Sequence, residues 1–248
     1  MSGKFRFIVA LSALLCVAGP ALANPAQDRF DAAATALESR FGTQAEHPAP
    51  PPHSDPAVVK SFADMKASVD ELGTATFPAD YTSFMSVCQR LNLLNQRYMT
   101  AATGNPLVTT DVAYQDDLAP LLAMTTRCMA VHMPFFNQVL GSVPAAQRTA
   151  EQSAGIHQMQ AGIHQLLLGL VVSSVQPTYS QVNRTQLIAA GATYIDAFVP
   201  ALAVADRKVL LDQINANAPD LAKVWPKEAA VVMKSLARTD CTDLCAVP

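Results

Sequence analysis

Two histidines, whose side chains can bind metal ions or protons, lie in a short internal repeat. Ala154-Gly155-Ile156-His157-Gln158 returns seven residues later as Ala161-Gly162-Ile163-His164-Gln165. On a helix the Cα atoms of His157 and His164 would lie about 10.5 Å apart, which suits two stacked sites better than one shared ion. If both imidazoles are instead buried in a helical core, their protonation near about pH 6 predicts a pH-sensitive response.

A second cluster combines Met129, His132 and Met133, with Met159 on the histidine repeat. Thioether and imidazole ligands suit Cu(I), and one histidine with one methionine is an axial pair for haem. Methionine also fills irregular gaps in helical cores, so we expect no cofactor and keep copper or haem binding as an alternative. The metal ligands of that alternative are His132, His157, His164, Met129, Met133 and Met159.

Other polar residues could orient a ligand without binding a metal. Asn92, Asn95 and Gln96, with Arg90 and Arg97, form one polar face of a predicted helix. If that face points inward it could hold the polar head of a ligand, and if it points outward it is an ordinary solvated face. The adjacent Asp116 and Asp117 would lie about 100° apart on a helix, which is a poor arrangement for a catalytic carboxyl pair.

Sequence motifs of common enzymes are absent. The chain contains no His-Glu-x-x-His, Gly-x-Ser-x-Gly, Ser-x-x-Lys, Walker or Gly-x-Gly-x-x-Gly pattern, and no Glu-x-x-His of a di-iron bundle. We therefore favour a protein without catalytic activity. A hydrolase whose catalytic residues are scattered along the chain stays an alternative.

Residues 1–23 have the pattern of a secretory signal peptide. Lys4 and Arg6 precede an apolar stretch, and Ala21-Leu22-Ala23 provides a cleavage signal after Ala23. The pattern predicts a periplasmic or secreted protein with no transmembrane segment in the mature chain. After cleavage, 15 basic and 20 acidic side chains give a formal charge of −5, which argues against nucleic acid as the partner.

Four cysteines remain after that cleavage: Cys88, Cys128, Cys241 and Cys245. An even number in an oxidising compartment favours two disulfides, with three possible connectivities. We expect Cys88 to pair with Cys128 between two helices, and Cys241 to pair with Cys245 in a small terminal loop. A free, catalytic or metal-binding pair is the alternative.

Helical spacing of apolar residues divides the mature chain into an arm, a linker and a bundle. Residues 24–42 form the arm, with Gly42 as its C-cap, and the proline-dense residues 43–55 form the linker. Residues 56–248 form the bundle. Its helices are expected near 55–73, 79–102, 111–140, 145–175, 180–217 and 220–237, with kinks or breaks at Pro120, Pro134, Pro200 and Pro226.

The repeat helix has apolar residues on both the glycine side and the histidine side, which predicts a central position in the bundle. Its glycines, Gly155, Gly162 and Gly169, are expected to allow close approach of another helix. The small residues Ala189-Ala190-Gly191-Ala192 are the candidate contact for that glycine stripe.

These patterns predict a secreted, all-α protein: a single bundle of about six or seven helices with kinked long helices and an N-terminal helical arm. Half of the residues are hydrophobic and 15% are charged, which favours a binding or accessory protein. Its expected partner is an apolar small molecule or lipid, or another envelope protein. The candidate ligand-binding residues are Met129, His132, Phe135, Phe136, His157 and His164.

Overall fold

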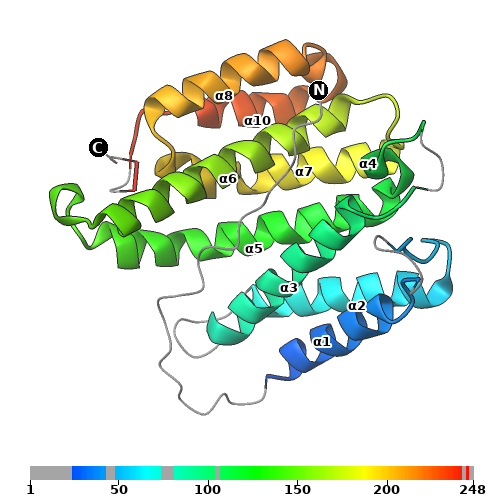
Figure 1. Cartoon of the computed structure of the whole chain (residues 1–248). Coiled ribbons are helices and arrows are strands. Elements are labelled where there is room, and N and C mark those ends of the chain that lie inside the picture. The colour runs from blue at the N-terminus through cyan, green and yellow to red at the C-terminus, as the bar shows by residue number, and fades with distance from the viewer. Residues whose placement is uncertain (1–23, 43–47, 74–80, 104–106, 242–243, 246–248) are drawn as a thin grey trace. The chain divides into compact units, whose positions relative to one another are not determined.

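The computed structural model describes residues 24–42, 48–73, 81–103, 107–241 and 244–245. These residues form ten α-helices and no β-strand, which confirms the predicted all-α class (Figure 1). There are more helices than the six or seven expected, because predicted segments are divided at Tyr114, Pro200 and Trp225. The predicted signal segment 1–23 and the linker residues 43–47 lie outside the described residues.

The chain forms two compact units. The N-unit comprises Leu22–Met129 and Gln176–Leu187, and the C-unit includes Ala130–Val175 and Ile188–Pro248. Two of their boundaries fall within α5 (Gln115–Gly141) and α7 (Gln181–Phe198), and another lies between Val175 and Gln176. Each of these two helices therefore contributes side chains to both units.

In the N-unit, α1 (Pro25–Glu38) packs on α2 (Pro56–Leu72). Asn24 and Asp55 cap the two helices, because each side chain accepts hydrogen bonds from backbone N–H groups of the first turn. The buried side chains of this helix pair include Phe30, Ala34, Leu37, Val58, Met65 and Val69. The boundaries predicted between arm, linker and bundle stay a prediction.

The ends of these two helices test two predicted C-caps. Gly73 caps α2, as its position after the last apolar residue suggests. The expectation for Gly42 is wrong, because α1 ends at Glu38 and Ser39 is its C-cap. The chain leaves the helix at Arg40 and Phe41, and Phe41 is buried in the N-unit core.

The rest of the N-unit core comes from α3 (Tyr81–Met99), the short α4 (Thr110–Ala113) and the first half of α5. A disulfide joins Cys88 of α3 to Cys128 of α5, with Cα atoms 5.7 Å apart, as predicted. Arg127 of α5 donates a hydrogen bond to the Asp70 carboxylate of α2, at 2.6 Å. The disulfide thus joins α3 to α5, and the ion pair joins α5 to α2, in addition to the apolar contacts of these helices.

The prolines act differently from one another. α5 runs without a break through Pro120 and Pro134. The predicted helix 111–140 is divided instead at Tyr114, before α5 begins. Pro200 lies in a 3₁₀ turn, Val199–Ala201, that separates α7 from α8 (Val204–Asn217). Pro226 begins α10 (Pro226–Leu236), directly after α9 (Leu221–Val224) and Trp225. A proline is tolerated at a first helical position because its missing N–H would have no partner there.

In the C-unit, α6 (Ala150–Val175) packs against α8 and α9, and α10 packs against α8 and α9 (Figure 1). The indole Nε1 of Trp225 donates a hydrogen bond to the Ser174 carbonyl, at 2.9 Å. The buried face of α6 follows a regular helical spacing: Ile156, Gln160, Ile163, Leu167, Leu170 and Ser174. This face lies between the glycine stripe and the histidine stripe.

Two expectations for α6 are wrong. His157 and Ala161 are exposed, so the histidine side of the first half of the helix is not covered. A methyl group added at Gly155, Gly162 or Gly169 would meet no described atom within 4 Å, so no described helix approaches closely there. The small-residue patch faces α6 at a different place, because a methyl group at Gly191 would lie 3.8 Å from Cβ of Leu170.

Among the described residues, no helix is long and apolar enough to cross a membrane.

Candidate functional site

The segment before α2 brings a histidine onto the N-unit. Pro51 is buried, and the Gly42 N–H donates a hydrogen bond to the Ala49 carbonyl at 3.3 Å. The Asp55 N–H donates to the Pro52 carbonyl at 3.0 Å, which closes a turn immediately before the helix. The described part of the predicted linker, residues 48–55, therefore folds onto the unit and gives His53 a defined position.

His53 lies against a buried carboxylate. Its Nδ1 atom is 2.6 Å from Oδ1 of Asp117, and the two side chains are 40% and 3% exposed. Asp117 lies in the first turn of α5, where the helix dipole favours a negative charge. Because an ionised carboxylate only accepts hydrogen bonds, Nδ1 donates and Nε2 is the ring nitrogen that faces outward. Nε2 makes no hydrogen bond to any residue in the described part of the chain.

Burial controls the electrostatics of this pair. It raises the pKa of Asp117 above its ordinary value, while the hydrogen bond from His53 acts in the opposite direction. Burial also raises the pKa of Tyr98, and the nearby Asp117 carboxylate raises it further. The site therefore combines a fully buried phenol, a buried carboxyl group and a half-exposed imidazole.

Aromatic rings surround this polar group. The Tyr98 ring centroid lies 5.2 Å from that of Phe41, 6.4 Å from that of Phe62 and 6.2 Å from that of Tyr114, all edge to face. The His53 ring lies 6.0 Å from Phe62. These contacts make the imidazole the polar, accessible edge of an aromatic cluster.

Asn95 and Tyr98, one turn apart on α3, bring two further polar groups to the N-unit core. The Asn95 amide donates to Oγ1 of Thr125 at 3.1 Å, but its Oδ1 is buried and unpaired, and the residue is 8% exposed. The hydroxyl of Tyr98 interacts with the Asp117 carboxylate, which raises the pKa of Tyr98. Buried polar groups are nearly always hydrogen-bonded, so Oδ1 of Asn95 is an exception among the described residues of this unit.

The polar face of α3, for which the sequence left both an inward and an outward orientation open, points inward only in part. Asn95 points inward, whereas Asn92, Gln96 and Arg97 are half-buried. Arg97 lies over the Phe41 ring, with its guanidinium carbon 4.2 Å from the ring centroid. Arg90 points to α1, where it donates hydrogen bonds to Asp31, Thr35 and Glu38.

The predicted ligand-binding residues of the C-unit are only partly together. His132 is buried on α5, and its ring lies 6.0 Å from that of Phe136, which is in turn 6.0 Å from Phe135. The three rings lie together because His132, Phe135 and Phe136 are neighbours on one helix. Met133 is buried as well, and Met159 is half-buried. Met129, the last N-unit residue of α5, is also half-buried.

The two repeat histidines have different surroundings. His157 is exposed, whereas Nε2 of His164 lies 2.8 Å from Oε1 of Gln213 on α8. The interpretation of both as buried imidazoles is therefore wrong for His157. In the described residues, no three His, Cys, Asp or Glu side chains are placed to hold a metal ion. The alternative of histidine with methionine ligands stays a prediction.

His53 and Asp117 cannot be recognised as a pair from the sequence. They are 64 positions apart, His53 follows a proline-dense stretch, and the sequence neighbour of Asp117 is Asp116 rather than a basic residue. The available signal was an aspartate directly before the apolar residues Leu118-Ala119-Pro120-Leu121, near the start of a predicted helix. A carboxylate at such a position needs a partner, but the sequence does not show which residue supplies it.

Comparison of the chain with protein-family models, with curated proteins and with solved structures finds no match.

Proposed function

We propose that this protein is a secreted or periplasmic helical binding protein that holds an apolar molecule with an acidic head group. Two disulfides and no membrane-crossing helix among the described residues support an extracytoplasmic location, together with the signal-like residues 1–23. Apolar composition supports an apolar ligand.

The observation that carries the proposal is the outward-facing imidazole of His53, held by buried Asp117 at 2.6 Å. The carboxylate fixes the ring orientation, with Nδ1 facing Asp117. In the imidazolium form both ring nitrogens donate, so Nε2–H is left to donate to an anionic acceptor, and charge-assisted hydrogen bonds of this kind are the strong ones. Arg97, over the Phe41 ring, adds a second positive charge beside the aromatic cluster.

The apolar part of the ligand would lie against the aromatic cluster and neighbouring side chains. Val59 precedes Phe62 by one helical turn and is 48% exposed. Ligand sites combine such apolar surface with a few polar groups that fix orientation. A long-chain carboxylic acid has both parts.

Binding fits the surroundings of His53 better than nucleophilic catalysis does. In a serine or cysteine triad, the outward imidazole nitrogen hydrogen-bonds to the nucleophile. In the part of the chain that the structure describes, Nε2 of His53 has no such hydroxyl or thiol partner. A histidine held by a carboxylate can also activate a water molecule, so the same pair supports a hydrolase as the second candidate.

Titration with hexadecanoate and with 1-hexadecanol tests the proposal, using wild type, His53→Gln and Lys208→Gln. Lys208→Gln is the control because Lys208 is 75% exposed, lies in the C-unit and belongs to no candidate ligand site. We expect wild type to prefer the acid, and His53→Gln to lose about tenfold or more in affinity for it. Equal affinity of wild type and His53→Gln for the acid would overturn the assignment of His53.

A second measurement separates the candidates. Native mass spectrometry of protein purified from the periplasm of its host should show a mass excess that is lost on denaturation. A clean mass with no binding of either probe would instead favour a protein partner from the envelope. Turnover of aryl esters that disappears in His53→Gln would favour the hydrolase.

A further inference from the structure

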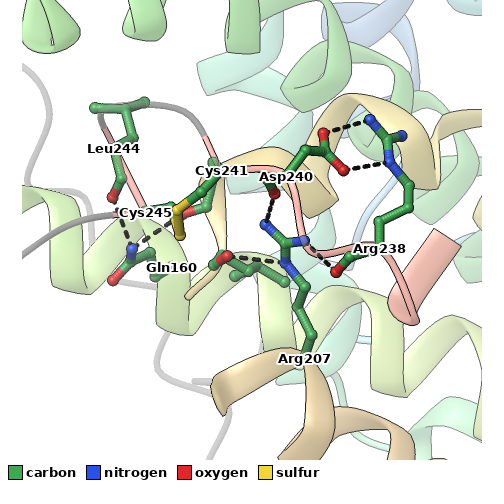
Figure 2. Close-up of a disulfide and its surroundings, with 9 residues drawn as sticks. Gln160, Arg207, Arg238, Asp240, Cys241, Leu244 and Cys245 are labelled. Carbon is green, nitrogen blue, oxygen red and sulfur yellow. Dashed lines mark hydrogen bonds and ion pairs between the residues drawn. A yellow bond between two sulfur atoms is a disulfide. The ribbon is translucent and has the colours of Figure 1, made fainter. Parts of the chain in front are cut away.

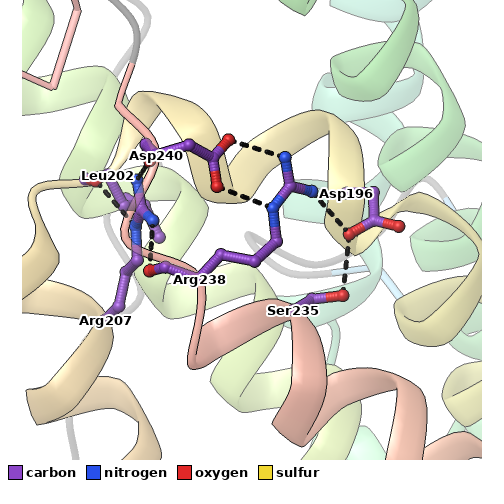
Figure 3. Close-up of polar contacts among 6 residues, drawn as sticks. All are labelled: Asp196, Leu202, Arg207, Ser235, Arg238 and Asp240. Carbon is purple, nitrogen blue, oxygen red and sulfur yellow. Dashed lines mark hydrogen bonds and ion pairs between the residues drawn. The ribbon is translucent and has the colours of Figure 1, made fainter.

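The chain after α10 is held to the C-unit by a buried arginine. Arg207 of α8 is 1% exposed, and its guanidinium donates to three backbone carbonyls. The acceptors are Arg238 at 2.7 Å and Asp240 at 2.6 Å (Figure 2), and Leu202 at 2.9 Å (Figure 3). Residues 238–240 are therefore fixed through their backbone.

An ion-pair network reinforces the same three residues. Arg238 binds both carboxylate oxygens of Asp240, at 2.8 and 2.6 Å, and reaches Asp196 of α7 at 2.9 Å (Figure 3). Ser235 donates to the same Asp196 oxygen at 2.7 Å. None of these contacts extends beyond Asp240.

The disulfide between Cys241 and Cys245 begins where this network ends. The two Cα atoms lie 5.5 Å apart, and Leu244 between them is fully buried. The Leu244 carbonyl accepts a hydrogen bond from the Gln160 amide of α6 at 2.9 Å, and the same amide nitrogen also binds the Ala201 carbonyl (Figure 2). The described part of this loop is thus held by the disulfide, by the buried Leu244 side chain and by the hydrogen bond from Gln160.

The two disulfides differ in access to solvent. Cys241 is exposed, while its partner Cys245 is 7% exposed. In the N-unit disulfide, Cys128 of α5 is buried and Cys88 of α3 is half-buried. The rate of thiol–disulfide exchange depends on access and on which sulfur is attacked. The C-terminal disulfide therefore offers one sulfur to an external thiolate.

We propose that Cys241–Cys245 is a thiol–disulfide exchange site whose substrate is an external dithiol. A thiolate of the dithiol bonds to Sγ of Cys241, the Cys241–Cys245 bond breaks, and Cys245 leaves as a thiolate that takes up a proton. The second thiol of the dithiol then attacks the mixed disulfide and releases Cys241. The dithiol is oxidised to a disulfide, and this protein receives two electrons.

Reduction has a local structural consequence. Without the disulfide, Leu244 loses the constraint that places it in the core, and Gln160 loses one of its two acceptors. Arg207 still holds the carbonyls of Arg238 and Asp240, so the change stops at Asp240. The oxidised and reduced forms therefore differ in one short segment of the C-unit. This difference does not depend on the ligand site proposed in the N-unit.

Graded dithiothreitol on the native full-length protein, followed by iodoacetamide and peptide mass spectrometry, tests the site. We expect alkylation of Cys241 and Cys245 while Cys88–Cys128 stays oxidised. Hydrogen exchange should then quicken around Leu244 and Gln160 but stay unchanged at Arg238. Reduction of both disulfides together, reduction of neither, or unchanged exchange would each overturn the proposal.

A matched pair of variants tests which sulfur is attacked. Cys245→Ser leaves Cys241 as the free thiol, and Cys241→Ser leaves Cys245. We expect the Cys241 thiol to form a mixed disulfide with oxidised glutathione at least about tenfold faster, because it is the exposed one. Equal rates, or a faster Cys245, would contradict the assignment of Cys241. Circular dichroism of both variants checks that they are folded.

Discussion

His53 and Asp117 form a hydrogen bond of 2.6 Å between positions that are 64 residues apart. The bond joins the segment after the proline-dense stretch to the first turn of α5. Since it orients the imidazole on which the proposed ligand site depends, its energetics deserve direct measurement.

Asp117→Asn should change how stability depends on pH. Burial raises the pKa of Asp117 above its ordinary value of 3.8, so the folded protein holds this proton more tightly than the unfolded chain does. The group therefore contributes most stability below pH 3.8, and that contribution is lost as pH rises through the raised pKa. Relative to wild type, we expect the free energy of unfolding of Asp117→Asn to increase with pH across this window.

Urea denaturation at several pH values measures that trend. Asp212→Asn is the control for loss of one negative charge, because Asp212 is exposed and paired only with exposed Lys208. If Asp117→Asn shows the same pH dependence as wild type, burial does not govern the ionisation of Asp117.

The two disulfides should stabilise the fold unequally. They close loops with separations of 40 and 4 residues. The loop-entropy relation gives about 4 kcal/mol for the longer loop and about 2 kcal/mol for the shorter one. We expect Cys88→Ser/Cys128→Ser to lower the free energy of unfolding more than Cys241→Ser/Cys245→Ser does. Chemical denaturation of the two double variants decides the order.

Loss of the buried guanidinium should be costly. Arg207→Leu leaves three carbonyls without their donor, and we expect a loss of about 3–4 kcal/mol. Arg238→Gln is the comparison, because Arg238 is partly exposed and its ion pairs should contribute about 1 kcal/mol or less. Equal losses in thermal or urea unfolding would show that the ion pairs stabilise the C-terminal segment as much as Arg207 does, contrary to this expectation.

Two glycine substitutions should act in opposite directions. Gly162→Ala should stabilise α6 by about 0.5–1 kcal/mol, because alanine favours the helix and its methyl group has open space. At Gly73 a methyl group would lie 2.7 Å from Nε of Arg127, so Gly73→Ala must displace the arginine that binds Asp70. We expect Gly73→Ala to be destabilising. The melting temperature should rise for Gly162→Ala and fall for Gly73→Ala.

Local pattern predicts the helices of this chain well. Apolar spacing near 3.6 residues locates α1, α2 and α3 to within a few residues, and the all-α class follows from it. The pairing of Cys88 with Cys128 and of Cys241 with Cys245 was also predicted, from the expectation that one pair bridges helices and one closes a small loop.

Orientation and long-range pairing are less accessible from the sequence. In α6 both histidine and glycine stripes carry apolar neighbours, so apolar content alone did not show that Ile156 and Ile163 form the buried face between them. Pro120 and Pro134 did not break α5, because packing overrides local preference. The pairing of His53 with Asp117 depends on how distant segments fold together.

The contacts of Arg90 decide how α1 is aligned on the N-unit. Phe30, Ala34 and Leu37 repeat at helical spacing, so a slip of α1 by one turn would again present apolar residues. Arg90 binds Asp31, Thr35 and Glu38, and after such a slip it would face at most one carboxylate. The apolar side chains therefore supply the affinity of α1 for the rest of the unit. Two cations set its register: Arg90 from α3, and Arg29 of α1 itself, which binds Ser68 and Glu71 of α2.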